Sequence, residues 1–427
     1  MTRRWLAALG GITVVAFGIR LAGAVAFLPS QPGGDSYYVH YPANLIADGH
    51  WFQNPFEWML NHRFEDSVIH PPLYILYLAT GSALGLRSYF SHAVLSVLLG
   101  TAAVAVVGLL GRRIGGGRVG LLAAGVAAVY PNLWLHDTIV MSESLYLLTI
   151  ALVLLAGVAV WERPTAGRIA LLGVAVGLAT LTRGEALALL PLLVVPAVLR
   201  RPRRPASGGS HLATVDRPIG ARLGWLAVGL AAAAAVILPW SVWTSLRFGQ
   251  PVLISIDSEE VLAAANCPQA YTGERLGYWS LDCLAGALPG NEAHRGSLRR
   301  EEGLHYASAH LDEVPGVVAA RIGGALGVFR PFRHVHFGAL EGRDVTWGDV
   351  GLWAYWVMVP LAAFGTWVLR RRDGILWPLL APIVMVPLVT GLIYGSIRFR
   401  LAAEIPLVVL TSVAIDRWLP GPKASPR

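Results

Sequence analysis

Long apolar runs, separated by short loops that carry arginine, recur from one end of this chain to the other. Apolar residues make up 55% of the 427-residue sequence and charged residues only 14%, whereas soluble domains contain about 25% charged residues. A run of roughly 20 apolar residues can cross a bilayer as a helix. Because lipid offers no partner to free backbone groups, spans must be helices or a closed barrel. The runs are too long for barrel strands, so we predict an all-α polytopic membrane protein.

We expect about ten transmembrane helices, with additional interfacial helices. The predicted spans lie near residues 5–28, 89–110, 119–130, 145–160, 169–182, 186–199, 223–243, 347–369, 375–394 and 401–419. Strongly basic stretches flank them at residues 3–4, 111–118, 163–168, 200–204 and 370–372. With this number of crossings, all these stretches fall on one side of the membrane. The positive-inside rule assigns that side to the cytoplasm, which predicts a multi-pass plasma-membrane protein with cytoplasmic termini.

The formal net charge of +8 comes almost entirely from arginine, with Lys423 as the only lysine. The arginines cluster in short loops between apolar runs, where they determine topology. We therefore expect these arginines to lie beside a lipid bilayer, and we do not expect them to bind nucleic acid.

Two apolar runs near the N-terminus can be interpreted in more than one way. The first resembles a signal peptide at Ala24-Val25-Ala26, but it is longer than an h-region of roughly 7–15 residues and Arg20 interrupts it, so we retain it as a span. The run at 73–86 is followed by another apolar run and then by a basic loop. One crossing between these points satisfies the charge rule, so residues 73–86 should lie along the interface.

The predicted spans divide the chain into three parts. Residues 1–244 form an N-terminal transmembrane module whose first outer loop covers residues 29–88. Residues 245–347 form an extracytoplasmic segment, and residues 348–427 form C-terminal transmembrane helices with a short cytoplasmic tail. The stretch 200–222 is rich in Arg, Pro, Ser and Gly, which predicts a flexible cytoplasmic linker.

Both cysteines, Cys267 and Cys283, lie in the extracytoplasmic segment. Two thiols cannot complete a four-ligand zinc site by themselves. In an oxidising compartment we expect them to form a disulfide.

The first outer loop concentrates ionisable side chains in a chain that is poor in charge. Asp35, Glu65 and Asp66 lie there with His62 and His70. A carboxylate at the bilayer rim can take a proton from an acceptor hydroxyl, and we predict this role for Asp35; a solvated acid or a helix cap is the alternative. Carboxylates beside imidazoles can also hold a divalent ion such as Mg²⁺ or Mn²⁺. The candidate ligands are Asp35, Glu65 and Asp66, although their spacing matches no compact metal motif, and positioning roles are the alternative for the last two.

Arginines at the outer ends of apolar runs are candidate phosphate ligands. Arg183 lies beside Glu185, and Arg398 and Arg400 precede the last span. A guanidinium group matches the geometry of a phosphate. The alternatives are an Arg183–Glu185 pair that holds the turn, and snorkelling of the other two arginines to the interface.

Three further charged residues lie in or beside apolar runs. Arg20 would either pair with an acid or phosphate inside the bundle or snorkel outward. Asp137 and Glu143 would cap or pair on an outer turn, and Glu143 is also a candidate substrate contact. The complete set of predicted substrate contacts is Arg183, Arg398, Arg400, Glu143, His70, Glu65 and Asp66.

The order of short motifs resembles that of the GT-C class of integral-membrane glycosyltransferases, most closely the branch of protein O-mannosyltransferases and aminoarabinose lipid A transferases. The matching motifs are Gly34-Asp35-Ser36-Tyr37, His70-Pro71-Pro72-Leu73-Tyr74, Arg112-Arg113-Ile114-Gly115, Met141-Ser142-Glu143-Ser144-Leu145, Leu181-Thr182-Arg183-Gly184-Glu185, Pro239-Trp240 and Tyr394-Gly395-Ser396-Ile397-Arg398-Phe399-Arg400. The likeness covers residues 1–420 as an ordered series. Two positions depart from the family pattern: Ser36 replaces the second acid of a frequent acidic pair, and Gly184 replaces a proline.

The resemblance implies a polyprenyl-phosphate sugar donor and transfer on the extracytoplasmic side. It implies that Asp35 is the catalytic carboxylate and that Arg183, Arg398 and Arg400 lie near the donor phosphate. The acceptor, whether glycan, lipid, protein or water, is left open.

A phosphate leaving group departs as an anion, so it requires cations rather than a general acid. One base on the acceptor is then enough, which predicts an inverting single displacement with Asp35 as the base. The alternative function is a transporter or flippase of a lipid-linked saccharide. The clustering of polar groups on one face and the lack of an evident internal repeat argue against it.

Overall fold

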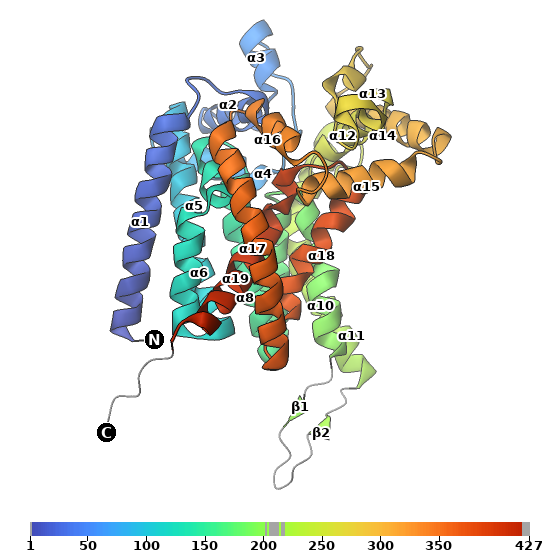
Figure 1. Ribbon diagram of the computed structural model, residues 1–427. Coiled ribbons are helices and arrows are strands. Elements are labelled where there is room, and N and C mark those ends of the chain that lie inside the picture. Colours follow the sequence, from blue (N-terminus) through green and yellow to red (C-terminus); the bar gives the residue numbers. More distant parts are fainter. Residues whose placement is uncertain (1, 201–202, 205–212, 215–217, 421–427) are drawn as a thin grey trace, which may run out of the picture.

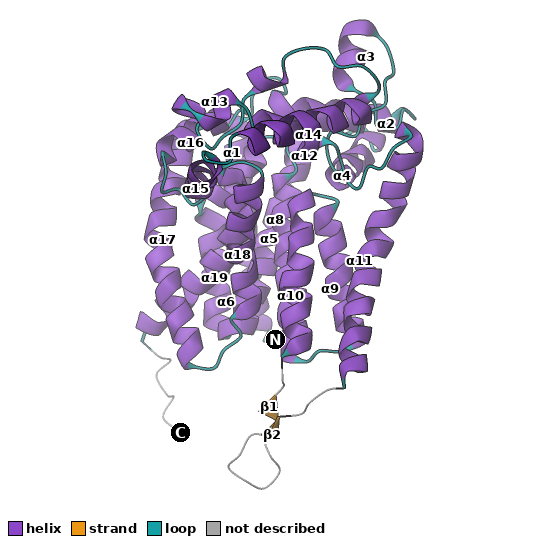
Figure 2. Cartoon of the chain, turned by 90° about the vertical axis from the view of Figure 1, so that its right-hand side faces the viewer, coloured by secondary structure: helices purple, strands orange, loops and turns teal. Residues whose placement is uncertain are grey.

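The computed structural model describes residues 2–200, 203–204, 213–214 and 218–420. Long helices run side by side between the two ends of the molecule (Figure 1). One end carries the first and the last described residues of the chain, and we call it the basic end. Short helices cover the other, which we call the site end (Figure 2). The only strands in the described part, β1 (Arg203–Arg204) and β2 (Ala213–Thr214), pair antiparallel within the predicted linker. The rest of residues 201–217 and the tail from residue 421 lie outside the described residues.

Each of the predicted spans corresponds to a helix. The bundle helices are α1 (Arg3–Phe27), α5 (Tyr89–Gly115), α6 (Gly117–Val129), α8 (Glu143–Glu162), α9 (Ala166–Thr180), α10 (Leu189–Leu199), α11 (Ile219–Phe248), α17 (Val345–Arg371), α18 (Trp377–Leu392) and α19 (Leu401–Trp418). Among the described helices, α1, α5, α8, α11 and α17 are long and apolar enough to cross a membrane alone, and a sixth candidate is the bent pair of α6 with residues 131–138. This all-helical membrane-type fold confirms the predicted class, while the count of about ten crossings stays a prediction.

Short helices at the site end complete the fold. They are α2 (Tyr37–Ala47), α3 (Pro55–Asn61), α4 (Pro72–Ala83), α7 (Pro131–Trp134), α12 (Asp257–Ala265), α13 (Pro268–Tyr271), α14 (Glu292–Ala309), α15 (Val314–Ala325) and α16 (Pro331–Ala339). Single turns of 3₁₀ helix join them at η1 (Gly34–Ser36), η2 (Leu135–Thr138), η3 (Gly184–Ala188), η4 (Gly273–Arg275), η5 (Leu281–Leu284) and η6 (Ile397–Arg400). The outer segment therefore contributes α12 to α16 to this end.

Small residues allow the bundle helices to approach closely. A side chain on Gly120 would place its Cβ 2.7 Å from the carbonyl oxygen of Gly108, across the α5–α6 contact. Gly116 makes the turn between these helices at φ +90°, a conformation that favours glycine. Gly365 of α17 faces the backbone of Leu410 in α19 even more closely. Close backbone packing of this kind is typical of helix contacts in membranes.

The run at residues 73–86, which we expect to lie along the interface, packs against other helices at the site end. It forms α4, which packs against α2 and also contacts α5. Tyr74 and Leu78 are buried, and the hydroxyl of Tyr74 lies 2.6 Å from that of Ser96 in α5. Because α4 is apolar on more than one face, it packs into the site end and supports the first outer loop.

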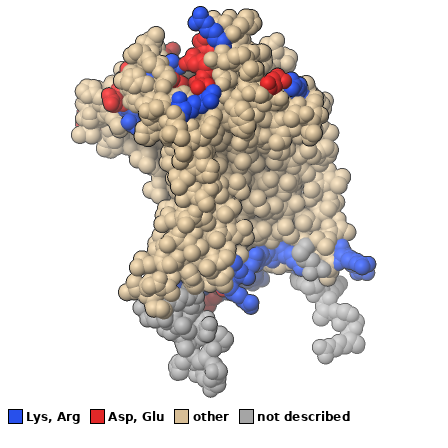
Figure 3. Space-filling view, turned by 180° about the vertical axis from the view of Figure 1, so that it is seen from behind, with Lys and Arg blue, Asp and Glu red and all other residues tan. Residues whose placement is uncertain are grey.

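Charge is distributed unequally between the two ends. In Figure 3, basic side chains gather at the basic end, whereas acidic and basic side chains lie together at the site end. Some arginines at the basic end pair with acids of neighbouring helices, as Arg113 does with Glu162 at 2.6 Å and Arg118 with Asp416 at 3.2 Å.

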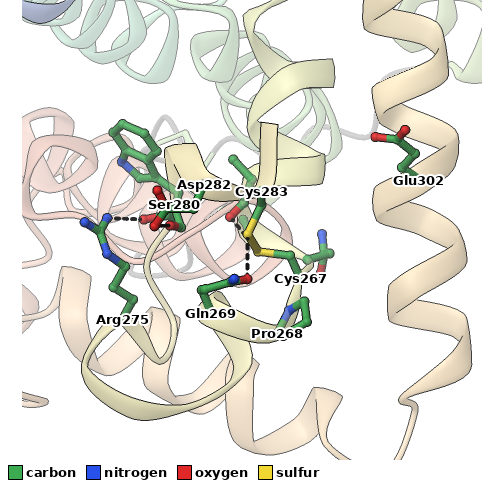
Figure 4. Close-up of a disulfide and its surroundings, with 12 residues drawn as sticks. Cys267, Pro268, Gln269, Arg275, Ser280, Asp282, Cys283 and Glu302 are labelled. Atoms are coloured by element: carbon green, nitrogen blue, oxygen red, sulfur yellow. Dashed lines mark hydrogen bonds between the residues drawn. A yellow bond between two sulfur atoms is a disulfide. The ribbon is translucent and has the colours of Figure 1, made fainter. Parts of the chain in front are cut away.

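Cys267 and Cys283 are joined by a disulfide, with their Cα atoms 6.2 Å apart. Figure 4 shows the bond between the start of α13 and the η5 turn. It closes a loop with a sequence separation of 16 residues, and a crosslink of this size stabilises a fold by about 3 kcal/mol in the chain-entropy view. The bond restrains the part of the outer segment that follows α12.

Candidate active site

A cavity of about 1090 Å³ lies at the site end. It exceeds the roughly 300–1,000 Å³ of a typical small-molecule site. Its polar part is lined by Asp35, His70, Arg183, Glu185, Asp257, Glu260 and Arg398. Its apolar part continues between α10, α11 and α18 and includes Leu187, Pro191, Val194, Leu226, Leu230 and Leu392. The cavity therefore joins a charged compartment to a hydrocarbon groove.

The first outer loop presents Asp35 to the polar part. Gly34 takes a left-handed conformation at φ +53° and opens the η1 turn. Oδ2 of Asp35 lies 3.2 Å from both terminal nitrogens of Arg398, and Oδ1 lies 3.9 Å from Nε2 of His70. The Asp35 side chain is 39% exposed, so it is paired and still open to the cavity.

The charge state of Asp35 follows from its neighbours. Burial alone would raise the pKa of Asp35, but the positive charge of Arg398 and, after it, the effect of His70 outweigh burial and hold this pKa below its ordinary value. The side chain is therefore an ionised carboxylate at neutral pH. Such a group can accept a proton but cannot donate one.

Glu143 is the centre of an ion cluster beside this cavity. It begins α8 and is fully buried. Its Oε1 accepts hydrogen bonds from Arg398 Nε at 2.6 Å, Arg183 Nη1 at 3.1 Å and Arg343 Nη2 at 3.3 Å. A buried carboxylate needs such partners to offset its desolvation. Glu143 brings three arginines from distant parts of the chain to one point, and this is the structural-pair alternative expected for it.

Arg183 forms the expected pair with Glu185 and also lies at the wall of the cavity. Its Nε donates to Glu185 at 2.6 Å, which holds the turn after α9. Its guanidinium also lines the cavity and lies over the ring of Phe399, 5.5 Å from the centroid. The pair with Glu185 therefore holds a cation at the wall of the cavity.

Arg398 and Arg400 have different partners at the η6 turn. Arg398 lines the cavity. Arg400 instead donates to Glu404 at 2.6 Å and lies over the ring of Tyr355, 3.6 Å from the centroid. Residues two apart in a 3₁₀ turn are rotated by about 240°, and of these two arginines only Arg398 lines the large cavity, although both line a small neighbouring one.

Glu65 and Asp66 do not line the cavity. Glu65 pairs with Arg295 of α14 at 3.0 Å, and Asp66 forms an ion pair with Arg247 of α11. They tie the first outer loop to these helices. The three candidate metal ligands are thus held by three different arginines, and the described residues contain no group of three or more His, Cys, Asp or Glu arranged to bind a metal ion. The side chains present therefore do not fit the metal site expected for them.

Four residues of the site end were not predicted from the sequence. Arg343 and Glu341 belong to the ion cluster, and Asp257 and Glu260 from the start of α12 line the cavity. Burial is the largest influence on the pKa of both Asp257 and Glu260, and it raises them. The available signals were charged groups beside apolar runs: Glu341-Gly342-Arg343-Asp344 precedes the run that forms α17, and Asp257-Ser258-Glu259-Glu260 interrupts a weakly polar stretch.

Arg20 does not snorkel to the interface. Its Nε lies 2.9 Å from Oδ2 of Asp137, and both side chains are 0% exposed. Its terminal nitrogens donate to the carbonyl oxygens of Ala127 and Ala128. Of the two alternatives, the structure selects pairing inside the bundle.

Comparison with known proteins supports the fold. Residues 69–243 match the family model described as dolichyl-phosphate-mannose-protein mannosyltransferase. The oligosaccharyltransferase AglB from Archaeoglobus fulgidus, in complex with an inhibitory peptide and a dolichol-phosphate, aligns over 97% of this chain and 50% of its own, with 12% sequence identity and a TM-score of 0.54. Its apo form gives the same identity and coverage with a TM-score of 0.56. The chain has the GT-C fold of membrane glycosyltransferases.

This GT-C chain spans about half the length of the archaeal enzyme. ArnT from Cupriavidus metallidurans bound to undecaprenyl phosphate aligns over 98% of the chain and 79% of its own, with 16% identity and a TM-score of 0.43. No curated protein matches the sequence. The family match includes His70, Glu143 and Arg183, whereas Asp35 and Arg398 lie on either side of it. The fold brings these separate parts of the GT-C chain to one cavity.

Proposed function

We propose that this GT-C protein transfers a sugar from a polyprenyl-phosphate donor to an acceptor hydroxyl at the extracytoplasmic face, by an inverting single displacement with Asp35 as the base. The observation that carries the proposal is the position of Asp35, 3.2 Å from Arg398 at the wall of a cavity that continues into an apolar groove. A glycan, lipid or protein can supply the hydroxyl.

The cavity matches the two chemical halves of such a donor. The apolar groove between α10, α11 and α18 suits an isoprenoid chain, and Arg183 and Arg398 at its polar end suit a phosphate. The archaeal enzyme of the same fold is in complex with a dolichol-phosphate. We assign the donor phosphate to the two arginines and the sugar to the space between them and Asp35.

In the proposed reaction, the acceptor oxygen attacks the anomeric carbon as its proton passes to Asp35. The bond between that carbon and the phosphate oxygen breaks, and the electron pair leaves with the polyprenyl phosphate. Arg398 and Arg183 stabilise the charge that develops on the leaving phosphate. A low pKa keeps Asp35 ionised and available as a base. The configuration at the anomeric carbon inverts, because one displacement occurs.

The proposed orientation places the site end outside the cytoplasm. Basic side chains gather at the opposite end (Figure 3), which the positive-inside rule assigns to the cytoplasm. The disulfide of the outer segment lies at the site end and suits an oxidising compartment. Both termini are then cytoplasmic, and the acceptor reaches the cavity from outside.

The test uses purified protein in detergent with a panel of polyprenyl-phosphate sugars and native membrane extract as the source of acceptor. Mass spectrometry should show free polyprenyl phosphate and a glycosylated product, both absent with Asp35→Asn. A carrier of lipid-linked saccharide would leave the donor intact. Full release of polyprenyl phosphate by Asp35→Asn would remove Asp35 from the mechanism, and intact donor throughout the panel would contradict the transferase function.

A further inference from the structure

Glu341 belongs to the turn between α16 and α17, in the outer segment. Its side chain is only 11% exposed, and its Oε1 accepts a hydrogen bond from Arg398 Nη1 at 2.6 Å. Its other oxygen pairs with Arg343. The turn itself is held in place: Gly342 has φ +95°, and a Cβ there would lie 2.9 Å from Cγ of Pro29. A side chain from the outer segment is thus fixed against the arginine that faces the proposed donor site.

The N–H groups of Arg398 are divided among three carboxylates. Its Nε donates to Glu143, and its Nη1 donates to both Glu341 and Asp35. Its Nη2 donates to Asp35. Of these acceptors, only Asp35 lines the cavity. Glu143 and Glu341 therefore hold the guanidinium from the protein side, and the edge shared with Asp35 is the edge open to a ligand.

We propose that Glu341 is a positioning residue for the donor phosphate: together with Glu143 it fixes the plane of the Arg398 guanidinium so that the cavity-facing edge is presented to the phosphate. The inference rests on the proposed function in that it takes the donor to be a polyprenyl phosphate. A planar fork binds two phosphate oxygens only when its plane is correctly set. The outer segment thereby takes part in donor recognition without touching the donor.

Glu341 could stabilise the fold simply by neutralising Arg343, and the contacts show how to separate this role from positioning. Arg343 also donates to Glu143 and lies 3.8 Å from the sulfur of Met141. If neutralisation is the only role, removing both charges with Glu341→Gln/Arg343→Gln restores binding. If Glu341 positions Arg398, the double variant stays defective, because the amide oxygen of glutamine is an uncharged and weaker acceptor for Arg398.

The first experiment measures binding without any transfer step. Undecaprenyl phosphate and undecaprenol are titrated in detergent against the full chain, with quenching of tryptophan fluorescence as the signal, since Trp279 lines the cavity. We expect Glu341→Gln to weaken binding of undecaprenyl phosphate about tenfold, the effect of replacing a charged acceptor of Arg398 by a neutral one. Binding of undecaprenol should not change. Glu341→Asp keeps the charge and should recover part of the affinity.

The matched control is Glu274→Gln in the same segment, which removes an exposed ion pair with Arg333 and should leave both affinities unchanged. Thermal unfolding of each variant checks that the fold is intact. An unchanged phosphate affinity in Glu341→Gln overturns the proposal, as does full recovery in the double variant. So does a wild-type chain that binds the phosphate and the alcohol equally.

The second experiment separates this inference from the proposed function. In the transfer assay, Glu341→Gln should raise the donor KM about tenfold and leave the acceptor KM unchanged. If the wild type transfers no sugar but binds undecaprenyl phosphate in a Glu341-dependent manner, the transferase proposal fails and the positioning role stands. If transfer occurs with a donor KM that does not depend on Glu341, the positioning role fails alone.

Discussion

Two of the ion clusters within the described part of this molecule differ in what surrounds them. Arg20 and Asp137 pair within the bundle at 2.9 Å, with no exposed side-chain surface, and neither lines the large cavity. Asp35, Arg398 and Arg183 belong to a cluster centred on Glu143 that does line it. Both clusters neutralise charge in an apolar protein. Only the second keeps part of its charge open to a ligand.

The difference shows how to distinguish a structural ion pair from a functional one in a membrane protein. Asp137 packs so tightly against α5 that a Cβ on Gly100 would lie 2.1 Å from its Oδ2. Asp35, by contrast, lies on a loop and is 39% exposed. A charged residue within a membrane is functional by default. The Arg20–Asp137 pair, however, is enclosed by protein on every side, which favours a role in holding the helices together.

The strongest test of this comparison is Asp35→Asn. The variant keeps the shape of the side chain and removes the base, so transfer should fall by about a thousandfold while the amount of inserted, folded protein stays the same. Release of polyprenyl phosphate measures the effect. Glu65→Gln is the matched control, because Glu65 lies in the same loop and pairs with Arg295 outside the cavity. An equal loss in both variants would contradict the assignment of Asp35 as the base.

The structural cluster should respond in stability rather than in chemistry. Arg20→Met leaves the buried carboxyl of Asp137 without its partner, at a cost of about 3 kcal/mol in the free energy of unfolding. Arg20→Met/Asp137→Leu removes both charges and should recover most of this loss. Thermal unfolding measures stability, and the specific activity of the folded fraction should remain near the wild type. A folded, stable Arg20→Met protein without activity would contradict a purely structural role for the Arg20–Asp137 pair.

The sequence could predict the helical membrane fold because length and hydropathy of apolar runs are local properties. It could not predict that Arg398 and Arg400 contact different partners, because the direction of each side chain depends on the 3₁₀ form of η6. Nor could it place Glu341, because one charged turn before α17 looks like any other until the outer segment folds back onto the site. The pairing of Glu65 and Asp66 with Arg295 and Arg247 likewise depends on contacts between residues far apart in the chain.

The two arginines of η6 allow a residue that lines the large cavity and a residue that does not to be compared within one turn. Arg398→Lys keeps a positive charge but loses the fork that bonds Asp35, so the donor KM should rise about tenfold. Arg400→Lys loses its pairing with Glu404 and its stacking on Tyr355, so it should lower stability by about 1 kcal/mol and leave the donor KM unchanged. Steady-state kinetics of both variants measures the donor KM, and thermal unfolding measures their stability. A donor KM that rises equally in both would place Arg400 at the donor as well.

The smallest expected effect is a dependence on pH where the first outer loop meets α14. Glu292 accepts hydrogen bonds from the hydroxyl of Ser67 at 2.9 Å and the backbone N–H of Val68 at 2.6 Å. Burial raises the pKa of Glu292 to about 7, more than these bonds lower it. The undocked carboxyl titrates near its ordinary value of about 4.3, so between these values the docked state binds more protons. Docking is then strongest below about pH 4 and weakens as pH rises through 7.

Hydrogen exchange of residues 64–70 between pH 5 and 8, corrected for the intrinsic rate, measures this dependence. Protection should fall with pH in the wild type and stay constant in Glu292→Gln, which keeps a carbonyl acceptor and cannot titrate. Asp35 cannot be the source of the change, because its pKa is held below its ordinary value and it stays ionised over the whole range. If protection instead rises with pH, the ionised form of Glu292 is the one that holds the loop, and the hydrogen bonds from Ser67 and Val68 outweigh burial.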